Sequence, residues 1–173
     1  MKKQFFIYLI FSLFIVHAKA QIEYALVQVN GMTCSACSFA VQQSLQKLPF
    51  VKSVDFDLNS KVAKVNFTNG NDVDLNKLSV RVQDAGYSVG VLQIAIADSL
   101  FVIQKGQIIT ADHSRFQILN SHSSPSSPLL LTLVGKNFMD DKTFKKYKYQ
   151  LPGLMDPGNT PSASFHTYYA VAL

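Results

Sequence analysis

Cysteine is scarce in this chain: of 173 residues only Cys34 and Cys37 are cysteines. Two thiols so near each other make a poor structural disulfide, because the loop that they close is very small. After the first twenty residues, no apolar run approaches the length of about 20 residues that a membrane-spanning helix needs. The two thiols therefore indicate a local chemical role and not a disulfide that stabilises the fold.

Dense basic clusters and catalytic motifs are also missing. The formal charge is +5, and it falls by three to +2 when the first twenty residues, which contain Lys2, Lys3 and Lys19 and no acid, are set aside. Neither a dense basic patch nor a recognisable nucleic-acid-binding motif remains, so we expect no nucleic-acid partner. No nucleophile–base pair, phosphate-binding glycine loop or catalytic carboxylate pair is recognisable. We do not expect an enzyme.

Residues 1–20 are typical of a secretory signal peptide. A charged start at Lys2 and Lys3 precedes an apolar core at 5–16, and Ala-Lys-Ala at 18–20 has the small-residue pattern of a cleavage site. We therefore expect a mature chain that begins at Gln21. It would be exported, either to the periplasm or as a secreted protein, and would have no stable membrane insertion after cleavage.

The two cysteines lie between an alternating, strand-like run at 22–29 and a helix-like run that begins at about Ser38. The N-terminus of a helix carries partial positive charge and unpaired N–H groups, which favour thiolate over thiol. Thiolates bind soft metal ions such as Cu(I). This placement predicts a metal site formed by Cys34 and Cys37.

The seven residues at 31–37, Gly-Met-Thr-Cys-Ser-Ala-Cys, resemble the GMTCxxC signature of heavy-metal-associated (HMA) domains. Such domains occur in copper chaperones, in N-terminal modules of copper-transporting ATPases and in the periplasmic mercury-binding protein. The resemblance covers about residues 22–96. It implies a protein that captures Cu(I) and transfers it to a transient partner, such as a copper-transporting ATPase or a copper enzyme.

Several metals and one redox reaction compete for the same two thiols. Two-coordinate dithiolate suits Cu(I) and also Hg(II), so mercury scavenging is an alternative. Zinc usually takes four ligands, and the motif loop offers no further His, Asp or Cys, which makes zinc a weaker candidate. A thiol–disulfide redox protein is the other alternative, although Gly-Met-Thr before Cys34 is not the pattern of thioredoxin-like motifs.

Three further residues receive roles from the resemblance. Met32 matches a methionine that points into the core and supports the loop. Thr33 can hydrogen-bond to the loop backbone and hold its shape. Tyr87 matches a residue that shields the metal from water, but it is equally well explained as an aromatic side chain that packs at the start of a strand.

Hydrophobic periodicity predicts a ferredoxin-like βαββαβ sandwich, an α+β fold, for residues 21–96. Asp72 or Asp74 is expected to cap the second helix, and Gly86 to end it. Pro49 is expected to end the first helix. The apolar faces of the predicted elements are Ala25, Val27 and Val29; Cys37, Val41, Leu45 and Leu48; Val54, Phe56 and Leu58; Ala63, Val65 and Phe67; Leu75, Leu78, Val82 and Ala85; and Leu92, Ile94 and Ile96.

Residues 97–173 predict a β-rich C-terminal domain, for which a small barrel or sandwich is plausible. The expected strands are 101–103, 107–110, 116–119, 129–134, an exposed lysine-rich strand at 143–150, and 168–173. The histidines here, His113, His122 and His166, lack the spacing of metal ligands, and Met139 and Met155 are isolated. We expect all five to be solvated or core residues.

Overall fold

The computed structural model describes residues 20–68, 72–97, 102–122, 128–149 and 166–173. Nearly all of the predicted signal peptide lies outside these ranges, as does Met155. The elements are β1 (Ile22–Asn30), α2 (Ser35–Gln46), β2 (Val51–Asp57), β3 (Val62–Phe67), α3 (Leu75–Asp84), β4 (Ser88–Ile96), β5 (Ile108–Ala111), β6 (Ser114–Ile118), β7 (Leu129–Val134), α4 (Asp141–Lys148) and β8 (His166–Ala172).

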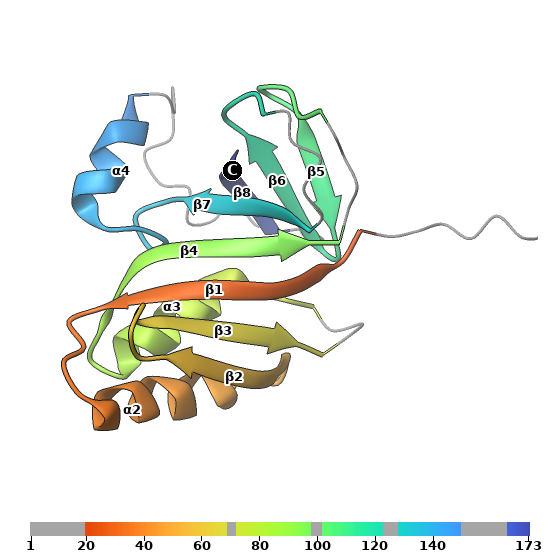
Figure 1. Cartoon of the computed structure of the whole chain (residues 1–173). Coiled ribbons are helices and arrows are strands. Elements are labelled where there is room, and N and C mark those ends of the chain that lie inside the picture. Colours follow the sequence, from red (N-terminus) through yellow and green to blue (C-terminus); the bar gives the residue numbers. More distant parts are fainter. Residues whose placement is uncertain (1–19, 69–71, 98–101, 123–127, 150–165) are drawn as a thin grey trace, which may run out of the picture.

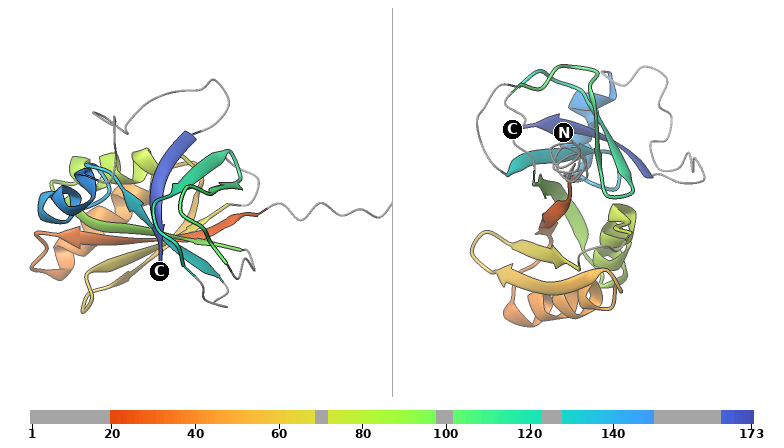
Figure 2. Two further views of the ribbon diagram at one scale, coloured as in Figure 1. Left: turned by 90° about the horizontal axis from the view of Figure 1, so that it is seen from above. Right: turned by 90° about the vertical axis from the view of Figure 1, so that its right-hand side faces the viewer.

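The first six elements form the predicted ferredoxin-like βαββαβ unit. Strands β2, β3, β1 and β4 lie side by side in that order, and all three pairings are antiparallel. Helices α2 and α3 cover one face of these strands, as Figures 1 and 2 show. The prediction of an α+β ferredoxin-like fold is confirmed.

Local sequence signals explain why these elements form where they do. Alternation in β1 turns Ala25, Val27 and Val29 into the core, where each is 0% exposed. Asp74 caps α3, because its side chain accepts a hydrogen bond from the backbone N–H of Asn76 at 3.0 Å. Gly86 follows this helix with a φ of +87°, a left-handed conformation that glycine adopts without steric cost.

Three local predictions in this unit were inaccurate. Helix α2 begins at Ser35 instead of about Ser38, and it ends at Gln46, before Pro49 can act as its stop. Leu58 was expected on the buried face of β2, yet it is 54% exposed. The strand ends at Asp57, whose carboxylate accepts hydrogen bonds from the next turn, and this turn carries Leu58 away from the core.

The sheet does not stop at β4. Strand β7 pairs antiparallel with β4, from Gln93 opposite Thr132 to Ile96 opposite Leu129, and β8, β6 and β5 follow. Within the described residues the result is one eight-stranded sheet, in which β6 and β8 form a parallel pair. The predicted domain boundary near residue 96 stays a prediction, but the sheet continues across it (Figure 1).

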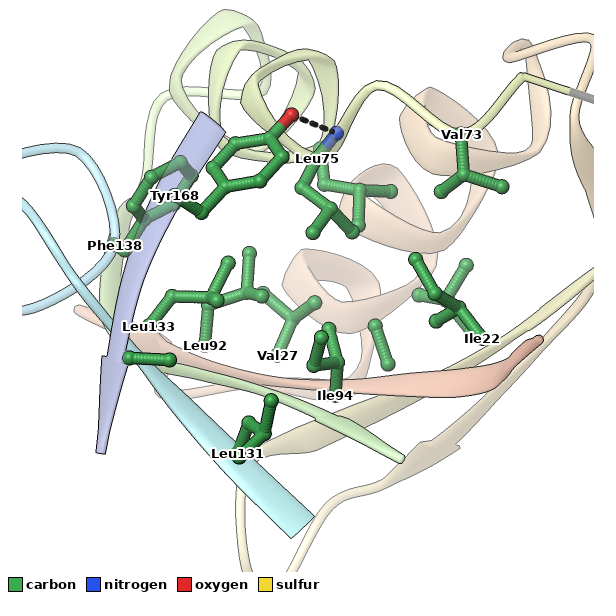
Figure 3. Close-up of a cluster of buried hydrophobic side chains, with 14 of the residues drawn as sticks. Ile22, Val27, Val73, Leu75, Leu92, Ile94, Leu131, Leu133, Phe138 and Tyr168 are labelled. Atoms are coloured by element: carbon green, nitrogen blue, oxygen red, sulfur yellow. Dashed lines mark hydrogen bonds between the residues drawn. The ribbon is translucent and has the colours of Figure 1, made fainter. Parts of the chain in front are cut away.

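One core joins the two halves of the chain. Leu92 and Ile94 of β4 pack in the same cluster as Leu131 and Leu133 of β7, and Figure 3 shows them beneath Tyr168 of β8. Burial of such aliphatic and aromatic side chains contributes about 1.5–3 kcal/mol each. The second half therefore helps to stabilise the first.

In the second half, four expected strands are confirmed: β7 has the expected ends, and β5, β6 and β8 have ends shifted by one or two residues. The strand expected at 101–103 is not found in its described residues, 102 and 103. Ile103 forms only an isolated bridge with His122, and Val102 is 62% exposed. None of the helices that the structure describes is long and apolar enough to cross a membrane.

The prediction of a lysine-rich strand at 143–150 is wrong, because residues 143–148 belong to helix α4. Asp140 caps the helix: its carboxylate accepts hydrogen bonds from the backbone N–H of Thr143 at 2.9 Å and from its hydroxyl at 2.7 Å. Phe144 and Tyr147, three residues apart, share the face that packs against the small cluster of Val134, Met139 and Val171. The alternation of lysines and aromatics therefore arose within a helix.

Candidate metal-binding site

The site begins where β1 ends. Asn30 is the last residue of β1, and Gly31 then turns the chain with a φ of +87°, where a residue with a Cβ would be strained. Met32 follows with its side chain buried, only 4% exposed. The turn and the buried methionine together fix the loop that carries Cys34 to the start of α2.

Cys34 is the N-cap residue of α2, and Cys37 lies in the first helical turn. The carbonyl of Cys34 accepts the first helical hydrogen bonds, from the backbone N–H of Cys37 at 3.1 Å and of Ser38 at 3.4 Å. The Cα atoms of the two cysteines are 5.4 Å apart, and their sulfur atoms face each other and are joined in a disulfide. The structure therefore brings both predicted thiols to one point.

The two cysteines differ in exposure. Cys34 is exposed, whereas Cys37 is half-buried and packs against the hydrophobic core. Residues 24–46 contain no Asp, Glu, Lys or Arg, so no acidic side chain lies in the first turn of α2. The partial positive charge of the helix N-terminus is thus not offset locally, and it stabilises negative charge on sulfur.

The other three predicted residues lie around this loop. The buried side chain of Met32 belongs to the core, as the resemblance implied. Thr33 is exposed, and within the described residues its side chain forms no hydrogen bond, so the expected bond to the loop backbone is not found. Tyr87 is half-buried against the core, and a Cβ built on Gly31 would lie 3.8 Å from its Cδ1. Tyr87 therefore packs on the core and also borders the loop at residues 31–34, which we call the metal loop.

A cleft of about 420 Å³ opens beside Cys34. On one side it is lined by the motif loop and the start of α2. On the other side it is lined by Phe56, Leu58 and Lys61, which come from the end of β2 and the following turn. Sequence analysis did not place these three residues beside the loop, because their approach to it depends on the pairing of β1 with β3. The backbone N–H of Val29 donates to the carbonyl of Lys61 at 3.0 Å and fixes this approach.

No second cluster of His, Cys, Asp or Glu suited to a metal ion occurs in the part of the chain that the structure describes. His166 instead lies 3.7 Å from the Asp72 carboxylate, and Met139 is buried. These two residues have the solvated or core environments that we expected. The two cysteines are therefore the candidate ligands that the geometry favours.

The described geometry can be compared with known proteins. Residues 26–88 match the family model of the heavy-metal-associated domain. This segment is an HMA domain. It is 37% identical over 60 residues to a copper-transporting ATPase of Helicobacter pylori, and 32% identical over 72 residues to a probable copper-transporting ATPase of Arabidopsis thaliana. These matches cover 35% and 42% of this chain but only 8% and 7% of the two relatives.

Two solved structures are also similar to the HMA segment. A CopZ metallochaperone is 27% identical, with a TM-score of 0.36 over 38% of this chain and 97% of that one. A copper binding domain from the P-type ATPase HMA7 is 31% identical, with a TM-score of 0.37 over 39% of this chain and 90% of that one. The family match supports metal binding by the HMA domain.

Proposed function

We propose that this protein is an exported carrier that captures Cu(I) between Cys34 and Cys37 and hands it to a transient protein partner. The relatives of the HMA domain are copper-transporting ATPases, so a membrane ATPase or a copper enzyme is the partner class that we favour. The single observation that supports this proposal most is that the two sulfurs meet at a helix N-terminus with Cys34 exposed.

The unequal exposure of the two cysteines suggests the order of the exchange. A two-coordinate Cu(I) bound by two thiolates has room for a third sulfur ligand. An incoming partner thiolate would bond to Cu(I) from the exposed side, next to Cys34. The bond between copper and Cys34 would then break, and the bond to Cys37 would break last. The oxidation state of copper does not change in these steps.

The disulfide between Cys34 and Cys37 must be reduced before metal can bind. A dithiol reductant would supply the two electrons and two protons and would itself become a disulfide. In an oxidising compartment the empty site can return to the disulfide. Metal loading would then protect the two thiols from oxidation.

Direct metal titration tests the proposal. The chain from Gln21 onward is reduced, kept without oxygen and titrated with Cu(I) in competition with a chromogenic Cu(I) chelator. We expect one tightly bound equivalent, and we expect Cys34→Ser and Cys37→Ser each to lose it. Ser35→Ala, at an exposed neighbour in the same loop, is the matched control and should retain it. Undiminished binding of one equivalent by Cys34→Ser would reject the proposal.

The alternatives use the same sulfurs and need other measurements. Hg(II) competes too well for most dithiols for binding to be decisive, so the test is which metal induces expression of the protein. A thiol–disulfide redox protein would reduce insulin in its metal-free form. We expect induction by copper and no insulin reduction.

A further inference from the structure

Helix α4 lies at the same end of the molecule as the metal loop, although it is about a hundred residues away in sequence. The N–H of Leu92 donates to the carbonyl of Phe138 at 2.9 Å, and the N–H of Asp140 donates to the carbonyl of Gly90 at 3.0 Å. These bonds fix the start of α4 beside the first residues of β4. Ser88, which begins β4, is paired with Asn30, the residue before the loop.

The views agree with these contacts. In Figures 1 and 2 (left), α4 and the connection from β1 to α2 lie at the same end of the sheet. The C-terminal half of the chain therefore adds a helix, outside the HMA segment, at the end of the sheet where the metal loop also lies.

This helix is strongly basic on its outer surface. Its apolar residues Phe144 and Tyr147 pack against the body of the protein, which leaves Lys142, Lys145 and Lys146 exposed, together with Asp141 in the first turn. Hydrogen bonds from the hydroxyl and the backbone of Thr143 to the Asp140 carboxylate lower its pKa, so it stays an anion that is engaged in capping. We call the three exposed lysines the α4 lysine face. Residues 136–149 contain five lysines and two aspartates, a net charge of +3.

Other charged groups at this end largely cancel. Arg81 pairs with Asp84 at 3.4 Å where α3 ends. Lys61, which lines the cleft beside Cys34, shares its turn with Asp57. Residues 24–46, which include the metal loop, carry no charged side chain. The α4 lysine face, offset in part by the exposed Asp141, therefore gives this end of the sheet a net positive charge.

We propose that the α4 lysine face is a docking surface for the acidic surface of the protein that exchanges metal with Cys34 and Cys37. This inference rests on the proposed function. Opposite charge at the same end of the molecule as an uncharged transfer site speeds encounter and selects the orientation in which the two metal sites meet. A lipid surface fits less well, because Phe144 and Tyr147 of α4 face inward, and among the described apolar side chains of α4 and its C-cap only that of Tyr149 is exposed.

The test compares two charge-matched variants of the chain from Gln21 onward. One replaces the α4 lysine face: Lys142→Gln, Lys145→Gln and Lys146→Gln. The control removes three exposed lysines from segments away from the metal loop: Lys47→Gln, Lys52→Gln and Lys105→Gln. The probes are two synthetic peptides of equal length that each carry one CxxC, one with four flanking glutamates and the other with four glutamines.

Docking is measured first without metal, by NMR titration of the reduced protein with each peptide at low and high salt. We expect the glutamate peptide to bind the wild type and the control alike, and to bind the α4 variant about tenfold more weakly at low salt. The difference should shrink when salt shortens the Debye length to about 8 Å or less. Rates of Cu(I) transfer from the loaded glutamate peptide should follow the same order.

Equal binding of the glutamate peptide by the α4 variant and the wild type would overturn the proposal. So would an α4 variant that loses binding only to vesicles rich in anionic lipid. Because the metal-free titration does not require copper, docking without Cu(I) uptake would reject the proposed function and leave the docking surface standing.

Discussion

The hydroxyl of Tyr168, in the last strand, accepts a hydrogen bond from the backbone N–H of Leu75 at 3.1 Å, at the first turn of α3. The two residues are 93 positions apart, and Figure 3 shows this bond above the shared core. The hydroxyl also lies 3.4 Å from Oδ1 of Asp74, to which it donates. The end of the chain thus helps to hold the second helix of the HMA domain.

Tyr168→Phe should therefore destabilise the protein by about 1–2 kcal/mol, because the buried N–H of Leu75 loses its acceptor. Burial, reinforced by the charge of Asp74, raises the pKa of Tyr168 well above its usual value. A raised pKa in the folded state gives stability that is complete below about pH 10 and is lost as pH rises further. Urea denaturation at pH 7 and above pH 10 measures both effects. If the difference in free energy of unfolding between the wild type and Tyr168→Phe stays constant above pH 10, this account is contradicted.

Gly135 has no room for a side chain. A Cβ at this position would lie 2.9 Å from Cδ2 of Phe138, whose ring is buried and packs edge-on against Tyr168. Gly135→Ala should cost about 1–3 kcal/mol, as overpacked sites do. Chemical denaturation of Gly135→Ala, Phe138→Leu and the double variant tests the cause. If the ring is the obstacle, the double variant loses less stability than the sum of the two single changes.

The cap of α4 should weaken in acid. The pKa of Asp140 is lowered first by the Thr143 hydroxyl and then by its backbone N–H, so this stabilisation is present above about pH 4 and is lost as pH falls through the lowered value. Amide exchange at Thr143 and Phe144 should become faster relative to the rest of the protein in that range. In Asp140→Ala the exchange should already be fast at neutral pH. Equal protection in both proteins at neutral pH would show that the carboxylate does not cap the helix.

The two halves of the chain should unfold together. Leu131 of β7 is 0% exposed, and Leu131→Ala should cost about 2–5 kcal/mol. Because β7 pairs with β4 and shares its core, amides of β3 in the first half should exchange faster as well as those of β6. Val80→Ala, at a side chain that is 49% exposed, is the control and should change little. Faster exchange confined to β6 would instead show that the second half opens alone.

Local patterns predicted most of the first half of the fold. The alternation of Val27 and Val29, the cap at Asp74 and the stop at Gly86 depend on neighbours in sequence, so they could be recognised without the structure. The meeting of Cys34 and Cys37 was predictable for the same reason.

What sequence analysis missed depends on distant segments. The pairing of Gln93 with Thr132 joins the two halves, and no local sequence pattern predicts it. The same is true of the side of the cleft that Lys61 supplies, because it requires β3 to lie beside β1. In α4, period-two alternation and helical spacing of Phe144 and Tyr147 coexist in one short segment, and the capping carboxylate of Asp140 decides between them.

Strand β4 has a neighbour on each side, β1 and β7. A fragment that ends at residue 96 would keep β4 but lose its neighbour β7. The backbone N–H and C=O groups of Gln93–Ile96 that face β7 would then be unpaired, next to the apolar side chains of Ile94, Ala95 and Ile96, and this open edge would favour self-association of the fragment. In the full chain, β7 covers this edge of β4, and charged side chains are not needed there to prevent pairing with another molecule.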